Sequence, residues 1–228
     1  MSLRDNRRSF LALATAGVAL VACHDEDEGE DVGAVEDLMR EHGVIRRVLV
    51  VYRESAARLR SSPTSVPPDA LQKAAQLMQN FGEDYHEKAL EEAHLFPAVK
   101  KAGGAAAGLI DALLAQHQRG REITGYVLSA SRQVIGAADA EPLARALEGF
   151  ARMYEEHAAQ EDTVVFQAWK KSMSKKQLDE MGDMFEDIEH KTFGKDGFDD
   201  AREKIAAIEA SLGITLAGML APAPLAIR

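Results

Sequence analysis

Two segments of the chain pair a histidine with a carboxylate about one helical turn later, which is a pattern that can hold a metal ion. In the second segment His157 and Glu161 are four residues apart. On a helix their side chains would lie on one face. In the first segment His86 and Glu91 are five residues apart. Because imidazole and carboxylate groups are ligands of iron, manganese and zinc, the pattern predicts a metal site with one regular and one irregular half.

The irregular half needs a distortion of its helix. In a regular α-helix, residues five apart point about 140° away from each other. We therefore predict a π-bulge between His86 and Glu91, because such a bulge absorbs one extra residue and is frequent at functional sites. Two alternatives stay open. Glu87 replaces or supplements His86, or Glu91 acts with His94 in a Glu-x-x-His element that resembles the one in di-iron bundles.

Two further histidines, His42 and His117, interrupt apolar stripes of two other segments. One such histidine alone is more often a hydrogen-bonded core residue than a ligand. Four such histidines together with two carboxylates favour a metal site. Buried polar groups without partners destabilise a protein, and a bound cation satisfies all of them at once. The predicted ligands are His42, His86, Glu91, His117, His157 and Glu161.

Helices must position these side chains. In the segments that hold the candidate residues, apolar residues recur every three or four positions. This spacing is typical of helices that pack in a bundle. The composition, with 46% hydrophobic and 6% aromatic residues, also favours an all-α fold over a sheet. The predicted divisions are a four-helix bundle over 34–171, a helical extension with one or two helices over 172–213, and a poorly ordered tail over 214–228.

The first 23 residues have the pattern of an export signal. Paired arginines precede an apolar run, residues 10–22, that is too short to span a membrane. The stretch NRRSFLA resembles the twin-arginine consensus, and LVAC resembles a bacterial lipobox whose Cys23 is lipidated. Residues 24–33 would be an acidic tether. We expect a periplasmic or cell-envelope lipoprotein that touches the membrane only through its lipid.

Charge and cysteine content exclude other classes of function. The formal net charge of −10 argues against a nucleic-acid partner, because a phosphate backbone is bound chiefly by clustered Lys and Arg. With Cys23 as its single cysteine, the chain has neither an intramolecular disulfide nor a thiolate metal site.

Four pieces of the chain resemble the hemerythrin-like HHE cation-binding domains. They are MREHG, DYHEKALEEAHLFPAV, AQHQRGREIT and EEHAAQEDTVVFQAW, and together they cover about residues 35–171. The resemblance implies an up-and-down four-helix bundle around two irons that are bridged by two carboxylates and an oxygen atom. It implies that the four histidines are terminal ligands and that Glu91 and Glu161 are the bridges. The oxygen carriers of the family have another histidine four residues after the third-helix ligand, where this chain has Arg121.

The resemblance implies a non-haem di-iron protein that binds or reduces dioxygen or a related oxidant. Its cofactor would be two oxo- or hydroxo-bridged iron ions, with manganese or zinc as weaker options. Apolar neighbours would keep bulk water away from the site: Ile45, Leu49, Leu113 and Phe150. A metal-binding or scavenging lipoprotein without redox turnover, and a structural bundle with satisfied core histidines, are the alternative interpretations.

Overall fold

A computed structural model describes residues 32–221, and the regular elements in this part of the chain are all helices. The elements are α1 (Ala34–Ser61), η1 (Pro63–Ser65), α2 (Pro68–Leu77), η2 (Met78–Leu95), α3 (Phe96–Ala102), α4 (Gly104–Ala107), α5 (Ile110–Ala130), α6 (Ala137–Gln160), η3 (Glu161–Val165), α7 (Phe166–Lys171), α8 (Lys175–Phe193), α9 (Gly197–Ser211) and η4 (Leu216–Gly218). The prediction of an all-α fold is confirmed. Signals that fall before residue 32, including Cys23, lie outside the described residues.

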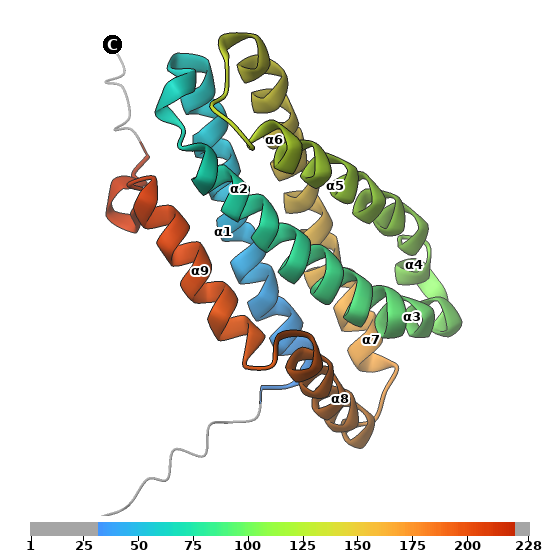
Figure 1. Cartoon of the computed structure of the whole chain (residues 1–228). Helices are drawn as coiled ribbons and strands as arrows, with labels where there is room; N and C mark the ends of the chain where they lie inside the picture. Colours follow the sequence, from blue (N-terminus) through green and yellow to red (C-terminus); the bar gives the residue numbers. More distant parts are fainter. Residues whose placement is uncertain (1–31, 222–228) are drawn as a thin grey trace, which may run out of the picture. The chain divides into compact units, whose positions relative to one another are not determined.

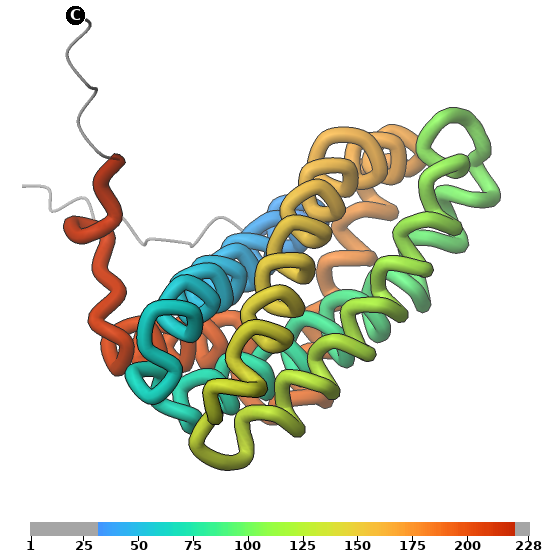
Figure 2. The backbone as a smooth tube through the Cα atoms, turned by 90° about the horizontal axis from the view of Figure 1, so that it is seen from above, coloured from blue at the N-terminus to red at the C-terminus, as the bar shows by residue number. Residues whose placement is uncertain are grey.

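Four long rods run in alternating directions and form an up-and-down bundle (Figure 1). They are α1, the continuous α2–η2–α3, α5, and the continuous α6–η3–α7. Figure 2 shows the first and third connections at one end of the bundle and the second connection at the other end. The second connection turns at Gly103 and Gly104, whose positive φ angles of 77° and 81° suit glycine.

Two of the rods contain a π-helical segment. The first segment, η2, includes the interval from His86 to Glu91, so the predicted π-bulge is confirmed, and the distortion extends well beyond that interval. The second segment, η3, begins at Glu161 and was not predicted, because His157 and Glu161 have regular spacing. Each π segment thus contains one of the two candidate carboxylates.

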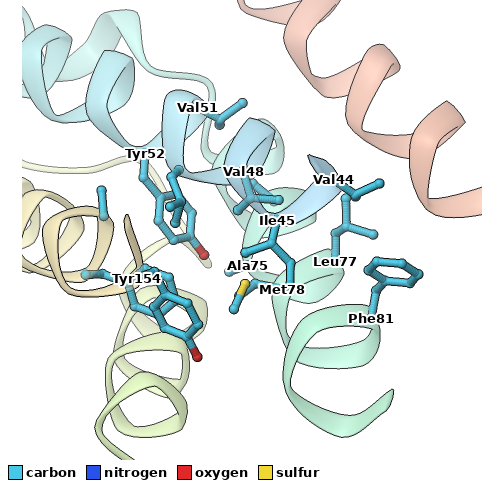
Figure 3. Close-up of a cluster of buried hydrophobic side chains, with 14 of the residues drawn as sticks. Val44, Ile45, Val48, Val51, Tyr52, Ala75, Leu77, Met78, Phe81 and Tyr154 are labelled. Atoms are coloured by element: carbon cyan, nitrogen blue, oxygen red, sulfur yellow. The ribbon is translucent and has the colours of Figure 1, made fainter. Parts of the chain in front are cut away.

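The bundle core is apolar on both sides of the polar centre. Figure 3 shows Val44, Ile45 and Val48 of α1 beside Leu77 and Phe81 of the second rod. The predicted water-excluding neighbours are all at most 3% exposed: Ile45, Leu49, Leu113 and Phe150. Such burial stabilises the fold by roughly 1.5–3 kcal/mol for each large apolar side chain.

The C-terminal helices pack against the outside of the bundle. Helix α9 lies along α1 and α2, and α8 contacts α1 and η2 (Figure 1). A capping box at Ser174 and Gln177 starts α8, and the side chain of Asp196 caps α9. Within residues 32–221 no helix is both long and apolar enough to cross a membrane.

Candidate metal centre

The six predicted ligands meet in the middle of the bundle, and each is at most 2% exposed. The Nε2 atoms of His117 and His157 are 3.1 Å apart. The His157 Nε2 atom lies 3.0 Å from a Glu161 oxygen, and the His86 Nε2 atom lies 3.5 Å from a Glu91 oxygen. The π segment therefore brings His86 and Glu91 to the same side of their helix. The structure unites all six side chains, and their role as metal ligands stays a prediction.

The six side chains form two overlapping groups, each compact enough to hold a cation. The groups are His42, His86 and Glu91, and Glu91, His117, His157 and Glu161, with the ligand atoms of each group within 4.8 Å of one another. Glu91 belongs to both groups. Glu161 also faces both, since its oxygens lie 3.4 Å from His42 Nε2 and 3.9 Å from His117 Nε2. Two carboxylates thus lie between two pairs of imidazoles.

Each histidine is held by a hydrogen bond at Nδ1, the nitrogen that faces away from the centre. The pairs are His42–Asp162 (2.7 Å), His86–Glu41 (2.5 Å), His117–Glu92 (2.8 Å) and His157–Gln116 (2.9 Å). Such bonds orient the ring and leave Nε2 free to bind a cation. Sequence reasoning missed these partners, although each is adjacent in sequence to a predicted ligand. Glu41 and Gln116 directly precede predicted histidine ligands, and Glu92 and Asp162 directly follow predicted glutamate ligands.

Two arginines connect this outer set of side chains to the surface. Arg46 binds Asp162, and Arg121 binds Glu92 at 2.6 Å. Each arginine is four residues after a candidate ligand histidine of its own helix. Their side chains are 43% and 27% exposed. Arg121, which stands where oxygen carriers of the resembling family have a histidine, therefore orients a carboxylate instead of facing the centre.

Neither alternative for the second helix places another side chain at the centre. The Glu87 carboxylate accepts a hydrogen bond from the Tyr154 hydroxyl and lies 3.2 Å from Arg121. His94 is half-buried, and its ring packs 6.2 Å from that of Phe185. The geometry therefore favours His86 with Glu91, and it gives His94 a packing role.

A phenylalanine at the end of each π segment stacks on a histidine. The Phe96 ring lies 5.4 Å from that of His117 with an interplanar angle of 17°. The Phe166 ring lies 5.3 Å from that of His42 with an angle of 19°. These apolar faces fix the rings and cover the centre.

The electrostatics of the centre make it costly without a cation. Burial and then the charge of Glu161 raise the pKa of Glu91 well above its ordinary value. Burial, followed by the charge of His42, lowers the pKa of His86. For Glu92, burial acts in the opposite direction, but hydrogen bonds from His117 and Arg121 outweigh it and lower the pKa to about 2. For Glu161, burial is outweighed by the nearby His157, and the pKa is lowered. Glu91 and His86 are thus disfavoured as ions, whereas Glu161 and the outer Glu92 are stabilised as ions.

Several buried atoms at the centre have no hydrogen-bond partner among the described residues. They are Nε2 of His86 and both carboxylate oxygens of Glu91 and of Glu161. Buried polar atoms without partners are rare in proteins and costly. All of them belong to side chains whose grouped nitrogen and oxygen atoms could hold a metal ion. The residues present therefore fit a pair of cations with nitrogen and oxygen ligands.

Comparison with known proteins agrees with this site. The hemerythrin HHE cation binding domain matches residues 33–169. The chain therefore belongs to the hemerythrin HHE cation-binding family, and the resemblance seen in its motifs is confirmed. Uncharacterized proteins of Mycobacterium bovis and Mycobacterium tuberculosis are 45% identical over 187 residues, which is 80% of this chain and 71% of theirs. No solved structure gives a significant match.

Proposed function

We propose that this chain is a non-haem di-iron protein that binds or reduces dioxygen or a related small oxidant. The observation that carries the proposal is the pair of overlapping ligand groups that share Glu91. Imidazole and carboxylate ligands projecting into a helical bundle suit iron, with manganese and zinc as weaker candidates. When bound, iron would supply the electrons that an oxidant accepts. His42 and His86 would hold one ion, and His117 and His157 would hold the other.

The residues of the chain contribute orientation and a dry environment. The Nδ1 partners hold the rings with Nε2 toward the centre, and the three carboxylate partners also strengthen the imidazoles as ligands. Phe96, Phe166 and Phe150 are at most 2% exposed and exclude bulk water. In such surroundings the charges of the centre interact more strongly than they would in water.

The experiment is metal analysis combined with a visible spectrum. The protein is loaded with ferrous iron without oxygen, freed of excess metal, and then exposed to air. We expect two irons per chain and the appearance of a charge-transfer band. His157→Asn should lower the iron content, whereas His94→Asn is the matched control outside the centre and should retain both ions.

Other outcomes would separate the competing functions. Tight binding of two ions with no spectral change on exposure to air would support a metal-binding or scavenging protein without redox turnover. Zinc in place of iron after loading with both, or no stoichiometric metal at all, would contradict the di-iron proposal. A gain in stability on replacing His157 and Glu161 by apolar residues, without loss of metal, would favour a structural bundle.

A further inference from the structure

The four histidines of the centre do not have equivalent partners. Three Nδ1 atoms face carboxylate oxygens, whereas Nδ1 of His157 faces the side-chain oxygen of Gln116 at 2.9 Å. The exception is clearest beside its counterpart in the other half of the bundle, where His86 faces Glu41 at 2.5 Å. Glu41 and Gln116 occupy matching positions, since each directly precedes a ligand histidine of its own helix and reaches the histidine of another helix.

The chemical difference between a carboxylate and an amide is twofold. An ionised carboxylate only accepts hydrogen bonds, so it keeps the imidazole proton on Nδ1 and leaves the Nε2 lone pair for the cation. Its charge also raises the basicity of the imidazole as a ligand. A glutamine is neutral, and a flip of its amide exchanges an acceptor for a donor. Gln116 therefore neither fixes the tautomer of His157 nor strengthens it as a ligand.

The remaining surroundings of the two halves match closely. Arg46 with Asp162 on one side corresponds to Arg121 with Glu92 on the other. Glu87 is an additional carboxylate on the side of His117 and His157. Its nearest histidine nitrogen is Nδ1 of His117, at 3.9 Å. The direct contact at Nδ1 of His157 is thus the feature that distinguishes this histidine from the other three.

Gln116 is also more accessible to solvent than Glu41. Glu41 is completely buried, whereas Gln116 is half-buried. An amide near the surface can exchange its bond to the imidazole for bonds to water at little cost. Glu41, which is completely buried, has no access to water for such an exchange.

We propose that Gln116 makes His157 the most weakly held of the four imidazoles, so that the cation flanked by His117 and His157 exchanges its ligands first. This inference rests on the proposed cation pair. It assigns the two positions different roles: the His42–His86 position is the firmly held one, and the His117–His157 position is where an incoming small molecule competes with a protein ligand.

The first test uses cobalt(II), which reports binding by its visible spectrum and needs no oxidant. The protein loaded with two cobalt ions is mixed with excess chelator, and metal loss is followed in time. We expect two phases. Gln116→Glu should slow the faster phase about tenfold, the lower end of the effect of such outer partners. The matched variant Glu41→Gln should speed the slower phase and leave the faster phase nearly unchanged.

The second test measures the tautomers directly in the metal-free protein. Nitrogen-15 NMR of the imidazole rings, at a pH where they are neutral and where Glu41, whose pKa burial raises to about 8, is ionised, should show His157 with both tautomers populated and His86 with its proton on Nδ1. Gln116→Glu should convert His157 to the Nδ1-protonated form, and Glu41→Gln should release His86 from it. If Gln116 had only a structural role, the two substitutions would not exchange the tautomer states of His157 and His86.

An unchanged faster phase in Gln116→Glu, with an intact far-UV spectrum and two cobalt ions bound, would overturn the inference. So would a wild-type His157 that is fully protonated on Nδ1. Neither result would affect the di-iron proposal, which depends on iron content and on the response to air. Conversely, a protein that binds two cobalt ions with these phases but shows no redox change with iron would contradict only the proposed function.

Discussion

The backbone N–H of Phe96 donates a hydrogen bond to the carbonyl of Glu91, five residues earlier. Phe166 and Glu161 make the same bond in the fourth rod. In each case the residue that accepts this bond carries a candidate bridging carboxylate, and the residue that donates it carries the ring that stacks on a histidine of another helix. The π geometry thus sets the direction of a ligand and of its apolar cover together, as expected where such segments occur at functional sites.

The first prediction concerns the hydroxyl of Tyr154, which donates to the buried Glu87. Tyr154→Phe leaves a buried carboxylate with one partner fewer, so we expect the free energy of unfolding to fall by about 1–3 kcal/mol. Tyr52→Phe is the matched control, because the buried Tyr52 hydroxyl has no partner among the described residues. Urea unfolding should show this second variant to be as stable as the wild type or more stable. Equal losses in both variants would contradict the assignment.

The second prediction concerns Gly120 on α5. A Cβ atom at this position would lie 2.5 Å from the Tyr154 hydroxyl oxygen. We expect Gly120→Ala to lower the free energy of unfolding by about 1–3 kcal/mol, because the buried tyrosine must shift. Gly125→Ala on the same helix meets no atom within 4 Å and should stabilise the protein by up to about 1 kcal/mol. Thermal unfolding of both variants measures the difference, and a stable Gly120→Ala would show that the tyrosine has room to move.

The third prediction concerns pH. Burial raises the pKa of Glu83 from 4.5 to about 7, although the hydrogen bond from Thr124 opposes this. The folded state therefore binds this proton more tightly than the unfolded chain does. Consequently the contribution of Glu83 to the free energy of unfolding falls as the pH rises from about 4.5 to about 7 and stays low above that range.

Glu83→Gln tests this linkage, because the amide keeps an acceptor for Thr124 and removes the charge. In the metal-free protein we expect a flatter dependence of stability on pH and a gain above neutral pH of at most about 3 kcal/mol. Urea unfolding at a series of pH values provides the measurement. Glu156→Gln, on an exposed face of α6, is the control, and an identical slope in the two variants would contradict the prediction.

The fourth prediction follows from the stretch LVAC, which resembles a lipobox and ends at Cys23, outside the described residues. We propose that this cysteine carries the lipid that anchors an exported protein. Cells that express the full chain with labelled palmitate should place label and protein together in the membrane fraction. Cys23→Ser should lose the label and move to the soluble fraction. A wild-type chain that is soluble and unlabelled would contradict the anchor.

The fold class and the candidate ligands could be predicted from the amino-acid sequence alone. The apolar period of three to four residues fixes which face of each helix is buried, and four histidines on those faces had to meet once the helices packed. The extra residue between His86 and Glu91 required a local distortion, because a regular helix would separate the two side chains. These inferences depend on local geometry, which the order of residues specifies directly.

The hydrogen-bond partners of the candidate ligands could not be predicted from the sequence, because they depend on how the helices pack. The bond between His42 and Asp162 joins residues 120 positions apart, and no local pattern fixes such a pairing. Glu87 shows the same dependence, because its spacing from Glu91 suited a ligand, yet its carboxylate turns toward Tyr154 and Arg121. The direction of a buried polar side chain is set by the partners that neighbouring helices offer, since an unpaired group is costly in the core. Those partners become known only when the helices are placed together.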